Sequence, residues 1–272
     1  TSTTATAAAA LPKAGGTMTG NIATAGISAV TAGTSNFVAG VNAGDSITSG
    51  GNNNTLIGDN AGTTITTASN NTAVGSRAMI ANTSGAENTA VGEQALTVNT
   101  TGANNTAIGK AALLLNTTAS NNTAVGSSAM YANTTGTRNT AVGALSLDAN
   151  TSGNYNTANG YNTLGANTTG AYNSGFGDSA LVSNTTGVRN SAVGHAALLN
   201  NTTGNYNVAI GMQVLSANTT ADNNTAVGYD SLNANTTGAN NTAVGKSALV
   251  VNTTGTSNTA VGKSALQTAT TG

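Results

Sequence analysis

Cysteine and tryptophan are absent from this chain of 272 residues, and proline and histidine each occur once. Only 6% of the residues are charged, 3% are aromatic, and the formal net charge is -1. Without an excess of basic side chains, the sequence offers no electrostatic basis for binding nucleic acid or an anionic membrane. Disordered chains are usually rich in charged residues and proline, so these absences also argue against disorder.

Long hydrophobic runs are also missing. No apolar stretch approaches the roughly 20 residues of a membrane span, and we predict no membrane insertion. No basic segment followed by a long apolar one marks a secretion signal. The lack of cysteine leaves the redox compartment undetermined, although it suits an exposed fibre.

Catalytic and metal-binding patterns are missing as well. His195 occupies a position that holds Glu93 or Lys246 elsewhere, which indicates an exposed and variable site. The eight acidic residues form no pair at fixed spacing, and no Cys/His cluster exists. Because catalysis needs convergent titratable groups and zinc or calcium needs clustered ligands, we predict neither an enzyme nor a cofactor.

A glycine at every seventeenth residue dominates what is present. The series is Gly58, Gly75, Gly92, Gly109, Gly126, Gly143, Gly160, Gly177, Gly194, Gly211, Gly228, Gly245 and Gly262. A short fixed period is typical of stacked supersecondary units that bury their apolar faces only against their neighbours. We therefore expect one rod rather than separate globular domains.

Each repeat reads Gly-x-x-Ala-Leu-x-x-Asn-Thr-Thr-Gly-x-x-Asn-Thr-Ala-Val, as in residues 245–261. Asn-Thr-Ala-Val alternates like a strand, so Thr and Val share one face while Asn and Ala share the other. We expect Val, with the Leu of a second strand, to form two aliphatic ladders inside each coil. This predicts an all-β parallel β-roll or β-solenoid of about thirteen coils, roughly 60 Å long at about 4.8 Å per coil.

Turns are expected at two places in each repeat. The periodic glycine follows the Val strand and is expected to turn the chain; the structural set is Gly75, Gly92, Gly109, Gly126, Gly143, Gly160, Gly177, Gly194, Gly211, Gly228 and Gly245. Asn-Thr-Thr-Gly supplies Asn for side-chain bonds to the backbone and Gly for positive φ. The small Ala beside Val suggests that the strand's other face packs against another chain; alternatively, Ala fills a tight turn within the coil.

The repeat resembles that of a known family. The many Asn-Thr-Ala-Val-Gly copies, and Asn207-Val208-Ala209-Ile210-Gly211, are similar to the Ser-Val-Ala-Ile-Gly repeat of YadA-like head domains in trimeric autotransporter adhesins. The resemblance implies a left-handed β-roll packed as a homotrimer. It covers residues 54–272, although the family's unit is usually shorter.

A second resemblance lies near the N-terminus. Residues 11–22, Leu-Pro-Lys-Ala-Gly-Gly-Thr-Met-Thr-Gly-Asn-Ile, are similar to an element common in bacteriophage tail fibres. We therefore expect a connector over 1–35, a transition or cap over 36–53 and the repeat rod over 54–272. The combination favours a phage tail fibre in the virion, with self-association and host attachment through a surface glycan or protein as its role.

Two other functions stay open. A bacterial autotransporter-type adhesin at the cell surface has the same repeat, but its heptad stalk and membrane anchor are not seen here. Ice binding is a further class, because Thr-rich β-solenoids can present flat Thr arrays; one Thr per strand, rather than a Thr-x-Thr pair, counts against it.

Departures from the repeat are the places where special functions are expected. The Val position holds Asn159 and then Phe176, and Gly175 replaces Ala beside Phe176. The Phe–Gly pair reads as a volume exchange across one strand, and Asn159 in a core position would need a hydrogen-bond partner from backbone or a symmetry mate. Neutral drift in a tolerant stack is the alternative.

A further departure is a run of large side chains just before the strand Asn. In five consecutive coils these are Arg138, Tyr155, Tyr172, Arg189 and Tyr206. Tyr and Arg favour stacking, cation–π contacts and recognition. We hypothesise that this column contacts a glycan or a neighbouring chain; alternatively, it stacks on itself. Ser in place of the three tyrosines would weaken surface binding in the first case.

The Asn-Thr-Thr motif has two readings too. It is formally a glycosylation acceptor, and it recurs at Asn99, Asn133, Asn167, Asn184, Asn201, Asn235 and Asn252. The alternative is an Asn ladder that satisfies turn backbone.

Overall fold

The computed structural model describes Ile27–Ser28 and residues 32–270, and within these ranges it contains strands and turns but no helix. The strands are β1 (Ile27–Ser28), β2 (Phe37–Ala39), β3 (Thr55–Ile57), β4 (Thr72–Val74), β5 (Thr89–Val91), β6 (Thr106–Ile108), β7 (Thr123–Val125), β8 (Thr140–Val142), β9 (Thr157–Asn159), β10 (Ser174–Phe176), β11 (Ser191–Val193), β12 (Val208–Ile210), β13 (Thr225–Val227), β14 (Thr242–Val244) and β15 (Thr259–Val261). The tail-fibre-like element at residues 11–22 lies outside the described residues.

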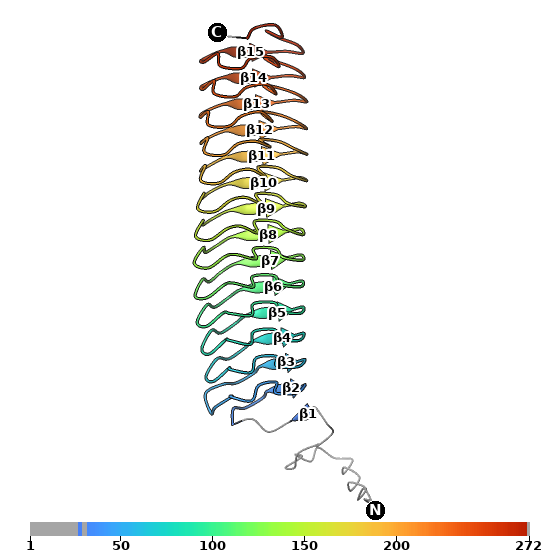
Figure 1. The fold of residues 1–272 in the computed structure, drawn as a ribbon, viewed down its shortest axis with the longest axis vertical. Coiled ribbons are helices and arrows are strands. Elements are labelled where there is room, and N and C mark those ends of the chain that lie inside the picture. Colours follow the sequence, from blue (N-terminus) through green and yellow to red (C-terminus); the bar gives the residue numbers. More distant parts are fainter. Residues whose placement is uncertain (1–26, 29–31, 271–272) are drawn as a thin grey trace, which may run out of the picture.

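The strands stack in sequence order into one 15-stranded sheet that runs the length of a straight rod (Figure 1). From β3 onward, each strand pairs in parallel with the strand 17 residues later, for example Thr242 with Thr259. The segment expected to be a transition carries β2, which pairs in parallel with β3 at an offset of 18 residues, while β1 is antiparallel to β2. The predicted parallel β-solenoid of about thirteen 17-residue coils is confirmed.

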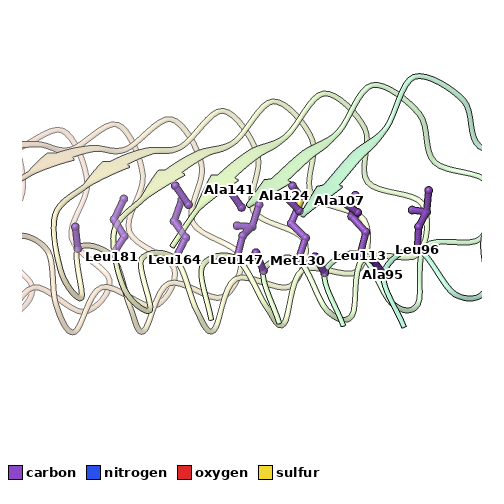
Figure 2. Packing of buried hydrophobic residues seen from close by; sticks show 14 of the residues in the cluster. Ala95, Leu96, Ala107, Leu113, Ala124, Met130, Ala141, Leu147, Leu164 and Leu181 are labelled. Carbon is purple, nitrogen blue, oxygen red and sulfur yellow. The ribbon is translucent and has the colours of Figure 1, made fainter. Parts of the chain in front are cut away.

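Each coil contains one strand, not the two that we expected. The Leu position lies in the turn after the periodic glycine, where Leu249 has φ 51° and Leu232 has φ 49°. Its side chain is nevertheless buried in every coil from Met79 to Leu249. Figure 2 shows these Leu and Met side chains rising from the turns toward the strands that carry Ala107, Ala124 and Ala141. The Leu ladder was predicted correctly, but the residues that form it have left-handed (positive φ) rather than extended backbone conformation.

The strand faces are inverted relative to the sequence prediction. Ala226 is 0% exposed and points into the coil, whereas Val227 beside it lies on the outer surface and is partly exposed. Where the Leu ladder fills the narrow coil, only a methyl group fits on the inward side of the strand; in the coils of β2 and β3, Gly44 and Gly62 occupy the Leu position, and the larger Val38 and Leu56 point inward instead. The expectation that Val lies inside and that Ala contacts another chain is therefore wrong; Ala fills the interior of its own coil.

Two ladders of asparagine hold consecutive coils together. In the strand ladder, Asn156 Oδ1 accepts the backbone N–H of Asn173 at 2.9 Å, and Asn173 Nδ2 donates to Gly187 O at 2.8 Å. In the turn ladder, Asn167 Nδ2 donates to Asn150 Oδ1 at 2.9 Å and to Gly170 O at 3.0 Å. Since buried polar groups must be hydrogen-bonded, these amides satisfy one another and the turn carbonyls.

The two glycine positions of the repeat are occupied by glycine for different reasons. The periodic glycine has positive φ, as at Gly245 (135°), and a Cβ there would lie 2.5 Å from Gly262 O. The glycine of Asn-Thr-Thr-Gly does not have the positive φ that we expected. At Gly187, for example, an added Cβ would lie only 2.4 Å from Asn184 Oδ1. Close packing favours glycine at the second position, but Ala68, Ala119 and Ala221 occupy it in other coils, so a small shift of the neighbouring atoms accommodates a methyl group.

Candidate interaction surface

The outward face of the sheet is formed by the Thr and Val positions of the strands. Along β3–β15 it carries no charged side chain. Several members of the Val position are among the exposed large hydrophobic residues, with exposed fractions of 37–43% at Ile57, Ile108, Phe176, Val193, Ile210 and Val244. The result is a long, uncharged stripe of aliphatic side chains and hydroxyls beside each other. We call it the Thr/Val face.

Asn159 and Phe176 are neighbours on this face. They are directly paired in adjacent strands, and Asn159 also pairs with Val142 on its other side. Asn159 is exposed, so the prediction that it sits in the core is wrong. Within the described residues its side chain makes no hydrogen bond to the rest of the chain.

Gly175 has a different cause from the one we predicted. It lies on the inward side of its strand, opposite to Phe176, and a Cβ there would be 2.6 Å from Thr163 Cγ2. Thr163 is buried and replaces the usual Ala after the periodic glycine. Its hydroxyl donates to Gly177 O at 2.6 Å. Gly175 therefore makes room for Thr163, and the exchange of volume does not involve Phe176.

The five large side chains before the strands form a continuous stack along one corner of the rod. Arg138 lies over the Tyr155 ring (5.3 Å from the guanidinium carbon to the centroid) and donates to its hydroxyl. The rings of Tyr155 and Tyr172 are stacked, with centroids 4.9 Å apart and 4° between planes. Arg189 lies 5.4 Å from the centroids of both Tyr172 and Tyr206, and Arg189 Nη1 donates to Tyr206 Oη at 2.7 Å. We call this set the Arg/Tyr column.

Every residue of the Arg/Tyr column is in the left-handed region, with φ between 57° and 60°. Asn, which is found at this corner in several other coils, adopts this conformation more readily than Arg or Tyr does. The stacking contacts offset that backbone cost. Neighbours cover both faces of the Tyr155 and Tyr172 rings, so the column presents mainly ring edges, hydroxyls and guanidinium groups to solvent.

The corner after each strand, which follows the periodic glycine, is more varied. His195 lies there, exposed as predicted. Lys110 Nζ is 3.2 Å from Glu93 Oε2, and Lys246 lies over the Tyr229 ring at 5.4 Å. Such exposed pairs contribute little to stability, but they show that equivalent side chains of successive coils contact one another.

In the described part of the chain, shifted pKa values occur at two separate places. Burial raises the pKa of Asp148, and a hydrogen bond from Tyr229 to Asp230 raises the pKa of that tyrosine. These groups belong to coils far apart along the rod. No cluster of three potential metal ligands occurs among the residues that the structure describes. Over the same ranges no helix is long and apolar enough to cross a membrane.

The Asn-Thr-Thr asparagines form the turn ladder. Each is buried, and Nδ2 of Asn184 donates to Asn167 Oδ1 at 2.9 Å and to Gly187 O at 3.1 Å. A glycan on Nδ2 would displace the neighbouring coil, so the folded rod leaves no space for this modification. The geometry favours the ladder reading.

No family model matches the chain, and no curated protein matches it either. The 17-residue period correctly predicted one column from Arg138 to Tyr206, but the Thr/Val face was not predicted, because Val was expected inside the coil. A signal was available: the Val position accepts Asn159 and Phe176, a range of polarity and volume that a narrow core would not tolerate.

Proposed function

We propose that this protein is a structural and adhesive fibre segment that associates as a parallel homotrimer through the Thr/Val face. The role that fits best is a phage tail-fibre shaft or head involved in attachment to the host surface. The observation that carries the proposal is the uncharged aliphatic face that extends over the whole rod. The resemblances to tail-fibre and YadA-like sequences support the setting, left-handed coiling and the number of chains.

The chemistry of the Thr/Val face favours a second copy of the chain as its occupant. Its rows repeat at the strand spacing of about 4.8 Å, and only a surface with the same repeat can match them along the entire rod. Another copy has that surface. The absence of charge on the face means that two copies can approach without desolvating unpaired ions.

The exposed apolar area is sufficient for association when all coils contribute. Covering the remaining exposed part of each Val or Ile gains about 1 kcal/mol per coil. Over the thirteen strands β3–β15 the sum is on the order of 10 kcal/mol, similar to the 4–15 kcal/mol lost on association. A few coils would not hold together, whereas the complete rod with its Thr hydroxyl contacts would.

The oligomeric mass in solution tests this proposal. We expect light scattering to give three times the chain mass of 26.1 kDa. Val125→Glu with Val227→Glu places charges on the Thr/Val face at two levels and should yield the monomer, because three copies would bring like carboxylates together without water.

Thr135→Glu with Thr237→Glu is the matched control. Both threonines are exposed in turns of nearby coils rather than on the strands, so this variant should keep the wild-type mass. A wild-type protein that is monomeric at micromolar concentration would contradict the proposal.

Ice binding is a second candidate for the same face. Thr and Val both point outward and form rows spaced about 4.8 Å across strands and about 6.6 Å along them, a flat and regular array. This use requires the face to be free rather than covered by another copy. Thermal hysteresis of the wild type, lost in Val125→Glu with Val227→Glu, would support it; the absence of hysteresis would reject it.

A further inference from the structure

The regularity of the rod creates a difficulty for any association of copies through the Thr/Val face. Each coil presents nearly the same pair of outward side chains, so sliding one rod by one coil, about 4.8 Å, again places Thr beside Thr and Val beside Val. A regular face therefore specifies the contact but opposes a slip of one coil only through the overlap lost at the rod's ends, about 1 kcal/mol, and weakly specified register is prone to slippage. A fibre with chains at different heights would have frayed ends.

Two adjacent positions of the Val row break this regularity most strongly; in the Thr row of β3–β15, Ser174, Ser191 and Val208 are the departures. Asn159 is the one amide and Phe176 the one aromatic ring at the Val position of β3–β15. They occupy paired places in adjacent strands. Asn159 projects an unpartnered amide from an otherwise aliphatic row, and Phe176 projects a ring that is 41% exposed. Nothing in the chain's own packing requires either one, since the neighbouring Gly175 responds to Thr163 on the inward side.

In a symmetric parallel assembly with its coils level, the Asn159 amides of all copies lie at one height and can hydrogen-bond to one another. The Phe176 rings lie together one coil away. A slip by one coil would place the amide against Val142 or Phe176 of another copy and leave it buried without a partner. A single buried polar residue fixes register in coiled coils by the same mechanism.

We infer that Asn159 and Phe176 are the register mark of the rod, which aligns copies of this chain in parallel with their coils level. The inference rests on the proposed self-association. One unsatisfied buried amide per chain is enough to favour the level arrangement over a slipped one by about tenfold or more.

Disulfide cross-linking can read the alignment directly, since the chain has no cysteine of its own. Chains with Val227→Cys are co-assembled with differently tagged chains carrying Val261→Cys, two coils away. Level copies hold these positions at heights that differ by roughly 9.6 Å, which is beyond disulfide reach. We expect cross-links between Val227→Cys chains but fewer than about a tenth as many between the two kinds of chain.

Asn159→Val combined with Phe176→Val removes the register mark. Because valine is the usual residue at both positions, this variant should fold. In this background, we expect cross-links between the two kinds of chain to increase about tenfold relative to those between like chains, because only the overlap lost at the ends of the rods then opposes slippage. Val91→Asn with Ile108→Phe, added to it, rebuilds the mark four coils earlier and should restore the level pattern.

Failure of the inference and failure of the proposed function give different results. Variants that assemble and keep the level cross-linking pattern without the mark would overturn the inference and leave self-association intact. A wild-type chain that is monomeric and forms no cross-links would overturn both.

Discussion

The inward and outward faces of the same three-residue strands follow opposite rules. Inward, Ala226 and the equivalent alanines are buried, and few other residues appear at that position. Outward, the Val position holds Val, Ile, Asn or Phe, and much of each side chain remains accessible. Both faces are largely apolar, so hydrophobicity alone does not distinguish them.

The difference shows that volume and hydrogen bonding, rather than hydrophobicity, define the interior of a narrow coil. A wide core gains most from large apolar side chains, but this one is closed by Leu, Ala and paired amides. The outward face has no such restriction within one chain. Its aliphatic character is therefore available for contacts with other molecules.

The largest predicted effect comes from placing a charge in the inward ladder. In Asn167→Asp, a carboxylate would face Asn150 Oδ1 and Gly170 O, which now accept hydrogen bonds from Nδ2 of Asn167. We expect a loss of about 3 kcal/mol or more in the free energy of unfolding at pH 7, as for an uncompensated buried charge. Denaturant titration of the isolated rod measures it.

The pH dependence of this variant identifies the cause. Burial raises the pKa of the new carboxyl in the folded state above its unfolded value of about 3.9. The variant should then be most stable below pH 4 and lose stability as the pH rises. Asn104→Asp, at an exposed corner with φ 59°, should change stability by less than about 0.5 kcal/mol at any pH; equal effects at both sites would refute the distinction between ladder and corner.

A smaller effect is expected from adding volume to one face and then to the other. Ala226→Leu inserts methyl groups between the inward Ala209 and Ala243 of the adjacent strands, and overpacking of this kind costs about 1–3 kcal/mol. Val227→Leu, one residue away on the outward face, should stay within about 0.5 kcal/mol in the monomer. Similar thermal midpoints for the two variants would show that the coil interior can expand.

Periodicity made the stacking predictable, whereas the assignment of faces was not. The glycine at every seventeenth residue and the short alternating Asn-Thr-Ala-Val stretch together predicted a stacked β-structure. The choice between Val and Ala as the inward residue depends on coil width, which is set by the turns. Three turn positions in each coil, such as Ser247, Leu249 and Ser257, have left-handed backbone without being glycine. Sequence alone favours other conformations for such residues.

The Arg/Tyr column could be predicted as a column because the period places its members in successive coils. The stacking contacts within the column could not be predicted, because they depend on a left-handed backbone corner that directs each ring onto the next. Thr163 was missed for a related reason. Thr163 lies in the preceding coil, and its methyl group occupies the space beside Gly175. This contact can be recognised only when the turn geometry is known.

The smallest predicted effect concerns this column. Tyr172→Asn removes the stacked contact with Tyr155 and the cation–π contact with Arg189, which together contribute about 1–2 kcal/mol. Asn adopts the left-handed corner more easily than Tyr does and recovers part of this loss. We therefore expect the rod to lose no more than about 1 kcal/mol, measured by denaturant titration against Asn240→Asp as a corner control outside the column, since Asp also adopts the left-handed conformation readily. A loss well above that value would mean that the column stabilises several coils together, and it would then belong with the inward ladders rather than with the tolerant outer surface.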